Sequence, residues 1–362
     1  MRHSVKMVVL AVVMAALLAG AQAFAGASRG PALESRIEVA QAAFTMTDEV
    51  AVTFALTNRG EETMRVLRWL TPLRGISNDL FVVTRDGEPV PYTGRLVKWA
   101  APTDADFIEI APGETVSAAI DMSSVYDMSV TGNYSIRYRA ILGGRDERDP
   151  FVMETESAEV SGEPGFLTSN QVSLFVEGRE PEIRTPEDQL EMGIAGIGGY
   201  TSCSNSQKTS LATAHANAKT ISTKAYNHLV SYPSGSTLYA TWFGSYTSSR
   251  FSTVKSHYTS LKTTFANKTF TFDCSCTDSA YAYVYPTQPY KVYLCSAFWS
   301  APAMGRDSKA GTLVHETSHF NVVAATQDYV YGATGAKNLA KTNPTKAIKN
   351  ADNHEYFAED QP

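Results

Sequence analysis

The second half of the chain is built around residues 311–320, which read Gly311-Thr312-Leu313-Val314-His315-Glu316-Thr317-Ser318-His319-Phe320. The small and apolar lead-in predicts a buried helix over about 307–323. On a helix, His315 and His319 project from one face one turn apart, so both imidazoles can bind one metal ion. Glu316 lies beside the first imidazole, where its carboxylate can take a proton from an attacking water.

A catalytic zinc takes three protein ligands, so the sequence after His319 must supply one more. A metzincin pattern is excluded, because the chain has Val322 and Ala325 where that pattern has Gly and His. Asp328 follows nine residues after His319 and can complete the site. Tyr331 could present its hydroxyl from the same side if the segment around it is helical.

These spacings, His315-Glu316-x-x-His319 and Thr326-x-Asp328-x-x-Tyr331-Gly332, resemble the aspzincin metallopeptidases, the deuterolysin family. The similarity covers about residues 199–362 and is strongest to the peptidyl-Lys metalloendopeptidases of that family. Other matching segments are 241–246, 272–276, 282–286 and 350–357. The resemblance implies an α+β, zincin-type fold.

The same resemblance implies a set of residue roles. One Zn²⁺ per chain would be bound by His315, His319 and Asp328. Glu316 would be the general base, and Tyr331 would donate a hydrogen bond to the oxyanion of the tetrahedral intermediate.

A pair of carboxylates near the C-terminus gives a hypothesis for specificity. Asp352 and Glu355 are three residues apart, so on a helix they share a face and can converge on one cation. From the residues alone, a solvated acidic helix face is the favoured interpretation. In the lysine-specific relatives the matching pair binds the side chain that follows the scissile bond, so the resemblance implies a pocket for a substrate lysine.

The N-terminal residues 1–23 are typical of a secretory signal. Arg2, His3 and Lys6 precede an apolar run, and Ala21-Gln22-Ala23 has the pattern of a cleavage site. The apolar run is too short to span a bilayer comfortably, so a membrane anchor is disfavoured. We therefore expect a secreted, extracellular protein.

The charge distribution divides the remainder of the chain. Residues 24–198 hold 28 acidic residues, 14 Arg and one Lys, a formal charge of −13. Residues 199–362 hold nine acidic residues, 12 Lys and two Arg, a formal charge of +5. Opposite charges favour a propeptide and an enzyme that attract one another. We expect a propeptide over 24–176, a linker over 177–198 and a protease domain over 199–362.

The expected propeptide alternates apolar and polar residues in short runs. Runs at 49–57, 81–85 and 134–139 are bounded by turn residues such as Asp86-Gly87. This pattern predicts an all-β domain, an antiparallel sandwich that is immunoglobulin-like in outline. We find no catalytic constellation in it.

The expected linker is rich in acidic residues, Pro and Gly, so it should be exposed and sensitive to proteases. Activation would cut between about 184 and 199. A passive spacer that is never processed is the alternative.

In the protease domain, Ser204 with Gln207 predicts a capping box before a helix that runs to about Leu229. A further helix is expected over 249–263 and strands over 268–273, 279–285 and 290–298. Asn343-Pro344 predicts the start of a short helix.

All four cysteines lie in the second half, at Cys203, Cys274, Cys276 and Cys295. An oxidising compartment favours disulfides over a cysteine metal site. Cys274 and Cys276 are too close to pair with one another, which leaves two connectivities. The resemblance favours Cys203 with Cys274 and Cys276 with Cys295.

Lys98 is the only lysine between residues 24 and 198. Our hypothesis is that it enters the specificity pocket and blocks it until the propeptide is removed. A surface lysine in a strand or loop is the plain alternative. Because no lysine lies between 99 and 207, cleavage before lysine cannot cut the linker, and a second protease or looser specificity in cis is needed.

We therefore expect a secreted, monomeric precursor of a zinc endopeptidase that hydrolyses peptide bonds on the N-terminal side of Lys. Its partners would be protein or peptide substrates and its own propeptide. One alternative is a deuterolysin-like protease without strict lysine preference, and another is a zinc-stabilised binding or adhesion protein. Nucleic-acid binding has no support, because the sequence has no cluster of basic residues. No segment is expected to cross a membrane.

Overall fold

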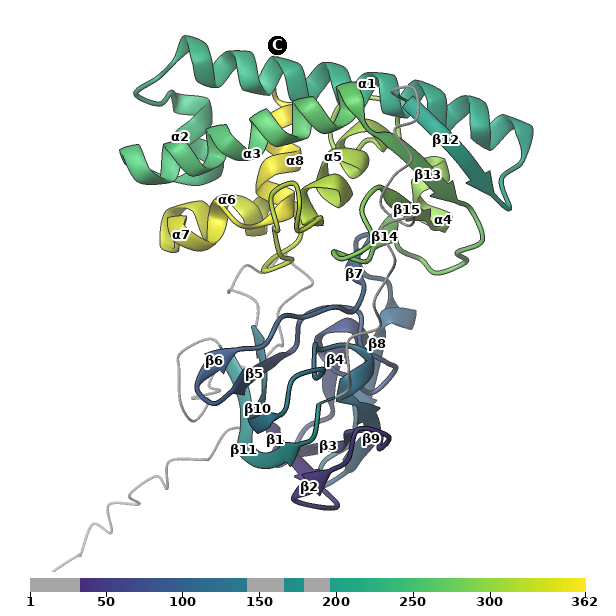
Figure 1. Cartoon of the computed structure of the whole chain (residues 1–362), viewed down its shortest axis with the longest axis vertical. Helices are drawn as coiled ribbons and strands as arrows, with labels where there is room; N and C mark the ends of the chain where they lie inside the picture. Colours follow the sequence, from purple (N-terminus) through teal and green to yellow (C-terminus); the bar gives the residue numbers. More distant parts are fainter. Residues whose placement is uncertain (1–32, 142–165, 179–195) are drawn as a thin grey trace, which may run out of the picture.

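The computed structural model describes residues 33–141, 166–178 and 196–362. The signal segment and residues 179–195 of the expected linker lie outside the described residues. The first half of the chain forms an all-β unit and the second half an α+β unit, as Figure 1 shows. None of the helices in the described ranges is long and apolar enough to cross a membrane.

The β unit is built from two sheets that share one apolar core. One sheet has the strand order β1-β3-β9 and the other β2-β11-β10-β5-β6, with β4 and β8 as a separate pair. Strand β3 alternates strictly and buries Val52, Phe54 and Leu56, which pack with Ile136 of the opposite sheet. The strands are β1 (Leu33–Val39), β2 (Ala43–Phe44), β3 (Ala51–Asn58), β4 (Met64–Leu67), β5 (Phe81–Arg85), β6 (Glu88–Pro89), β8 (Phe107–Ile110), β9 (Thr115–Asp121), β10 (Gly132–Ile141) and β11 (Phe166–Val176).

The α+β unit packs helices around a five-stranded sheet of order β12-β13-β15-β14-β7. Its own strands are β12 (Gly196–Thr201), β13 (Thr269–Asp273), β14 (Ala282–Val284) and β15 (Lys291–Leu294). Its helices are α1 (Asn205–Ser231), α2 (Thr237–Phe243), α3 (Ser248–Asn267), α4 (Ser296–Ser300), α5 (Lys309–His319), α6 (Gly332–Thr342), α7 (Pro344–Ala347) and α8 (Ala351–Glu359). Helix α5 is enclosed, with every residue from Ala310 to His319 buried.

Several elements follow from their local signals. Ser204 and Gln207 form the predicted capping box of α1, and Asn343 caps α7, with Pro344 at its first turn. Two predictions of length are wrong. The strand expected over 290–298 ends at Leu294 and gives way to α4. The helix expected to reach residue 323 ends at His319, because the chain folds back and the Thr326 N–H donates to the Ser318 carbonyl.

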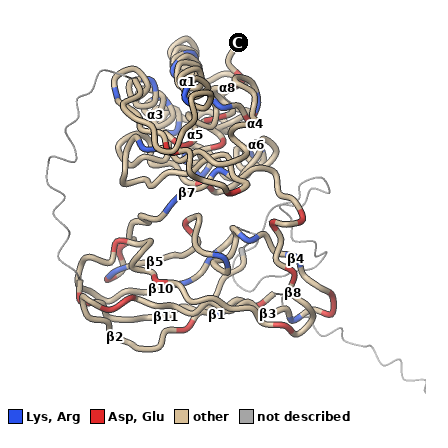
Figure 2. Tube along the Cα trace, turned by 90° about the vertical axis from the view of Figure 1, so that its right-hand side faces the viewer, with Lys and Arg blue, Asp and Glu red and all other residues tan. Residues whose placement is uncertain are grey.

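Strand β7 (Leu96–Lys98) connects the two units. It belongs to the first half of the chain, yet it pairs antiparallel with β14 and completes the sheet of the second half, with Lys98 opposite Ala282. β7 lies between the units in both Figure 1 and Figure 2. Apolar residues support this contact: Trp69 and Trp99 stack at 4.6 Å and pack in one cluster with Ala280 and Cys295.

Two disulfides brace the α+β unit. Cys203 pairs with Cys274 and Cys276 with Cys295, which is the connectivity that the resemblance favours. The first bond joins the segment before α1 to the end of β13, and the second joins the segment after β13 to the end of β15. Closing such loops stabilises a fold by on the order of 3 to 4 kcal/mol each in the chain-entropy account.

Candidate active site

Helix α5 presents both histidines because its start is fixed by side chains. The Ser308 hydroxyl caps the helix by accepting from the Gly311 N–H, and Glu359 of α8 accepts from the Ser308 N–H. His315 and His319 then lie one turn apart with ring centroids 4.8 Å from each other. Both side chains are fully buried, so the helix aims them into the protein rather than into solvent.

Asp328 meets the two histidines at one point. Its Oδ1 lies 3.2 Å from Nε2 of His315 and 3.4 Å from Nε2 of His319. These three ligand atoms lie within 4.8 Å of one another. None of them has a hydrogen-bond partner in the described part of the chain, although all are buried. Two imidazoles and a carboxylate thus converge, and their facing atoms are buried without hydrogen-bond partners. Such a set of ligand atoms fits a zinc ion.

The loop that carries Asp328 is held by hydrogen bonds at both ends. Nδ1 of His319 lies 2.9 Å from the Thr326 carbonyl, which can only accept, so this nitrogen carries the proton and leaves Nε2 free. Farther along, Oδ1 of Asn350 accepts from the Tyr329 and Val330 N–H groups. No role for Thr326 or Asn350 was predicted from the sequence, although both lie in segments that resemble the family.

Glu316 is completely buried next to His315. Both of its carboxylate oxygens lack a hydrogen-bond partner in the described residues. Burial raises the pKa of Glu316 to about 8, well above the usual value for a carboxyl group. A buried carboxyl with a raised pKa is suited to accept and return a proton near neutral pH.

Tyr331 reaches the site in a different way from the one considered in the sequence. The segment from Asp328 to Tyr331 is not helical, and Tyr331 is the N-cap residue of α6. Its hydroxyl donates to the Val97 carbonyl at 2.9 Å and lies 3.0 Å from Oδ1 of Asn78. Both partners come from the β unit. No sequence signal identified Asn78, since its role depends on a contact between residues 253 positions apart.

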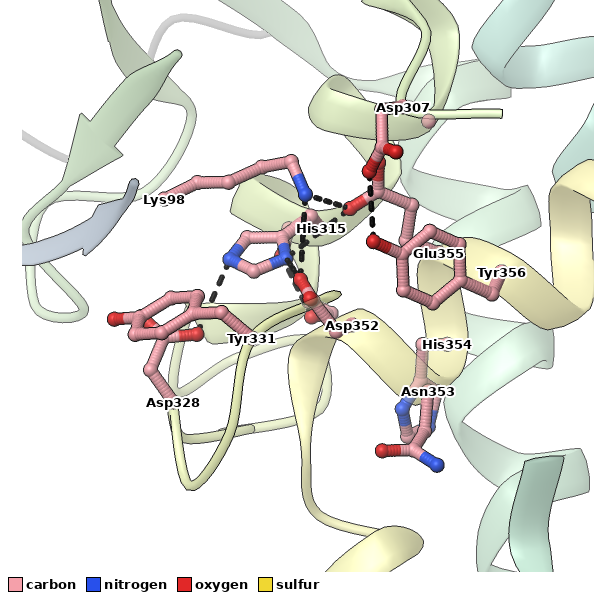
Figure 3. A network of polar contacts seen from close by, with 12 residues as sticks. Lys98, Asp307, His315, Asp328, Tyr331, Asp352, Asn353, His354, Glu355 and Tyr356 are labelled. Carbon is pink, nitrogen blue, oxygen red and sulfur yellow. Dashed lines mark hydrogen bonds and ion pairs between the residues drawn. The ribbon is translucent and has the colours of Figure 1, made fainter. Parts of the chain in front are cut away.

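Asp352 and Glu355 share one face of α8, as their spacing predicts, but this face is buried. The ammonium of Lys98 lies between them, 3.3 Å from Asp352 and 2.6 Å from Glu355, as Figure 3 shows. Burial alone would lower the pKa of Lys98, but the charges of the two carboxylates outweigh it and hold that pKa well above its usual value. A solvated acidic face and a surface lysine are both excluded as interpretations.

The comparisons with known proteins agree with this geometry. Residues 228–359 match the aspzincin family model, described as lysine-specific metallo-endopeptidase. An extracellular protease of Aeromonas hydrophila is 41% identical over 96% of this chain and 97% of its own length. A peptidyl-Lys metalloendopeptidase of Armillaria mellea is 36% identical over 87% of this chain and 88% of its own length.

Among solved structures, a zinc peptidase from Grifola frondosa is 47% identical over 44% of this chain and 98% of that chain, with a TM-score of 0.41. The identity and coverage of the Aeromonas and Armillaria relatives decide the assignment. The chain belongs to the aspzincin family of zinc-dependent metalloendopeptidases.

Proposed function

We propose that this chain is the secreted precursor of a zinc endopeptidase that cleaves peptide bonds on the N-terminal side of lysine. One observation carries the proposal: the buried ammonium of Lys98 lies between Asp352 and Glu355, and the carbonyl just before it, on Val97, accepts from the Tyr331 hydroxyl. A substrate cleaved before lysine would lie in the same way. Its lysine side chain would enter the acidic pocket, and the carbonyl of the preceding residue would accept a hydrogen bond from Tyr331. The lysine preference is supported by the name of the Armillaria mellea relative, a peptidyl-Lys metalloendopeptidase, and by the description of the family model.

The proposed chemistry assigns one task to each residue. His315, His319 and Asp328 would bind one Zn²⁺ per chain. When bound, the ion would supply Lewis-acid polarisation of the scissile carbonyl and lower the pKa of a water molecule. Glu316 takes the proton from the attacking water and passes it to the leaving amine. Tyr331 donates a hydrogen bond to the substrate oxygen that becomes the oxyanion. This substrate oxygen takes the place of the Val97 carbonyl oxygen as the acceptor.

The β unit would be the propeptide, an immunoglobulin-like sandwich that covers the site until it is released. In this arrangement β7 occupies the edge of β14 where a substrate strand would pair, and Lys98 fills the lysine pocket. The activating cut would fall in the linker before Gly196, because Gly196–Thr201 forms β12 of the catalytic sheet. The signal over residues 1–23 would direct secretion, and the enzyme would act as a monomer.

The test is a map of the cuts made in an unfolded protein, by mass spectrometry, with the activated enzyme and its Glu316→Gln variant. Cuts confined to X-Lys bonds and lost in the variant are expected. Cuts that depend on Glu316 but occur at varied residues would support a deuterolysin-like protease without strict lysine preference. A folded, zinc-loaded enzyme that makes no cuts would overturn the proposal in favour of a binding protein.

A further inference from the structure

Asp352 contacts more than the lysine ammonium. Its Oδ1 lies 2.8 Å from Nδ1 of His315 and 3.3 Å from Nζ of Lys98, and its Oδ2 accepts from the Gly332 N–H at 2.6 Å. Dashed lines in Figure 3 join this carboxylate to both the His315 ring and the Lys98 ammonium. One buried side chain therefore contacts the metal-binding helix, the residue after Tyr331 and the occupant of the lysine pocket.

Glu355 is not equivalent to Asp352. Its Oε2 lies 2.6 Å from Nζ of Lys98 but 3.3 Å from Nδ1 of His315. Neither of its oxygens makes a hydrogen bond to the backbone within the described ranges. Glu355 is thus nearer to the ammonium, whereas Asp352 is nearer to the histidine and is the one anchored to the loop of Tyr331. The two carboxylates have different tasks.

The two nitrogens of the His315 ring face opposite partners. Nε2 faces Asp328 and the position where a metal would bind, and Nδ1 faces Asp352. A carboxylate against the second nitrogen of a histidine ligand fixes its tautomer and ring orientation and makes the ring a better donor to a metal. The Gly332 N–H contact fixes the start of α6, and with it the backbone that carries the Tyr331 hydroxyl.

We infer that Asp352 is a positioning residue that joins lysine recognition to the metal centre. It orients His315 toward zinc and holds the Tyr331-Gly332 backbone, while Glu355 is the main receptor of the ammonium. This inference rests on the proposed function for the identity of the pocket. Its consequence is that the substrate lysine and the zinc ligand share one carboxylate, so loss of Asp352 affects binding of the metal and turnover as well as specificity.

The first test measures zinc affinity by chelator competition in the uncleaved precursor, where proteolysis is not needed. Asp352→Asn and Glu355→Gln are a matched pair, because each removes one negative charge and leaves Lys98 paired with the other carboxylate. Asp352→Asn should weaken zinc binding about 10- to 100-fold, and Glu355→Gln by less than about threefold. Equal losses in both variants, or none in Asp352→Asn, would overturn the inference.

The second test replaces zinc by cobalt and records the visible absorption, which reports on the ligands around the ion. A change in the Asp352→Asn spectrum and an unchanged Glu355→Gln spectrum would support the inference even if Asp352→Asn is less stable. Identical spectra for all three proteins would contradict it, because a residue that only stabilises the fold leaves the ligand geometry of the folded fraction unchanged.

Kinetics of the activated enzymes separate this inference from the proposed function. With a lysine peptide, Glu355→Gln should mainly raise KM and Asp352→Asn should mainly lower kcat. If both variants lose lysine selectivity equally while zinc affinity and cobalt spectra stay unchanged, the lysine pocket stands and the positioning role is wrong. If selectivity is unchanged in both while the zinc affinity of Asp352→Asn falls, the proposed pocket is wrong and the contact of Asp352 with His315 stands.

Discussion

The ammonium of Lys98 is a buried cation with 2% of its side chain exposed, and two carboxylates face it. Removing it by Lys98→Ala would leave Asp352 and Glu355 buried without a counter-charge, which typically costs about 3 to 5 kcal/mol. If Lys98 blocks the active site, as we propose, this block should therefore weaken. We expect activity of the uncleaved precursor on a lysine peptide to rise on the order of a hundredfold.

Arg95→Ala is the matched control for this substitution. Arg95 also lies in the β unit and pairs with Asp278 across the contact, but at 3.5 Å and with partly exposed side chains. Such a pair contributes at most about 1 kcal/mol, so the activity of the precursor should change by less than about fivefold. Electrophoresis of each precursor checks that it is uncleaved. An undiminished block in Lys98→Ala would show that Lys98 is not the blocking residue.

Two histidines behind the lysine pocket predict a dependence of stability on pH. Nδ1 of His354 lies 3.0 Å from the Asn350 carbonyl, so it carries the proton, and Nε2 then accepts from Nδ1 of His257 at 2.9 Å. Burial lowers the pKa of His354 to about 3 and that of His257 to about 4. In the unfolded chain both would titrate near 6.5.

Because the folded pKa values lie below the unfolded ones, the unfolded state binds more protons at acidic pH. The stabilisation is fully present above about pH 6.5 and is lost progressively as the pH falls toward about 4. Urea unfolding at about pH 7 and about pH 5 should show this loss. It should be smaller in His257→Asn, whose amide can still donate to His354 but does not titrate. An equal loss in both proteins would refute the role of the pair.

The packing of α5 against α8 leaves no room for a side chain at Gly311. A Cβ there would lie 1.9 Å from Oε1 of Glu359 and 3.0 Å from Cγ of Glu355. In an ordinary helix interior, Gly→Ala stabilises by up to about 1 kcal/mol. Here the overpacking should dominate, and Gly311→Ala should lower the free energy of unfolding by about 1 to 3 kcal/mol.

Gly335→Ala in α6 controls for the helix propensity. A Cβ at Gly335 would meet its nearest atom, Cβ of Val330, at 3.4 Å, which is an ordinary contact. This substitution should be neutral or stabilising by up to about 1 kcal/mol. Urea unfolding of the two precursors measures the difference. Equal stability of both variants would mean that α8 moves away from α5 at little cost.

The elements that the sequence predicts well are those with local signals. The capping box of Ser204 and the Asn343-Pro344 start of α7 depend on residues within one turn, and both are observed. The spacing of His315 and His319 likewise determines their common face. In contrast, the break after His319 depends on the returning Thr326, and the contact of Asn78 with Tyr331 depends on the packing of two units. Neither can be inferred from a window of neighbouring residues.

Across the whole molecule, the net charges of the two halves do not predict which half supplies the cations and which supplies the anions at their contact. The first half is acidic overall, yet it supplies the cations Arg95 and Lys98 to the ion pairs between units, and the basic second half supplies Asp278, Asp352 and Glu355. Figure 2 shows basic residues along α1 and α3, on the side of the second half that faces away from the β unit. The ion pairs at this contact therefore have the opposite polarity to the net charges of the two halves.

This arrangement predicts how the precursor behaves once its linker has been cut. If the β unit is the propeptide, as we propose, it should remain attached through the strand pairing of β7 with β14, a buried ion pair and the apolar cluster around Trp69 and Trp99. At 1 M salt the Debye length is about 3 Å, so interactions between exposed charges are largely screened, whereas buried ion pairs are screened much less. The cut precursor should therefore stay largely inhibited, and raising NaCl from about 0.05 M to about 1 M should release little activity.

The measurements are the activity of the cut protein on a lysine peptide and its size-exclusion profile, which shows whether the two units have separated. Slow release of the β unit at all salt concentrations is expected if a paired strand, a buried lysine and an apolar cluster hold the units together. Rapid full activity on cutting would contradict this prediction. Release that increases steeply with salt would mean instead that the attraction of net charges holds the units together.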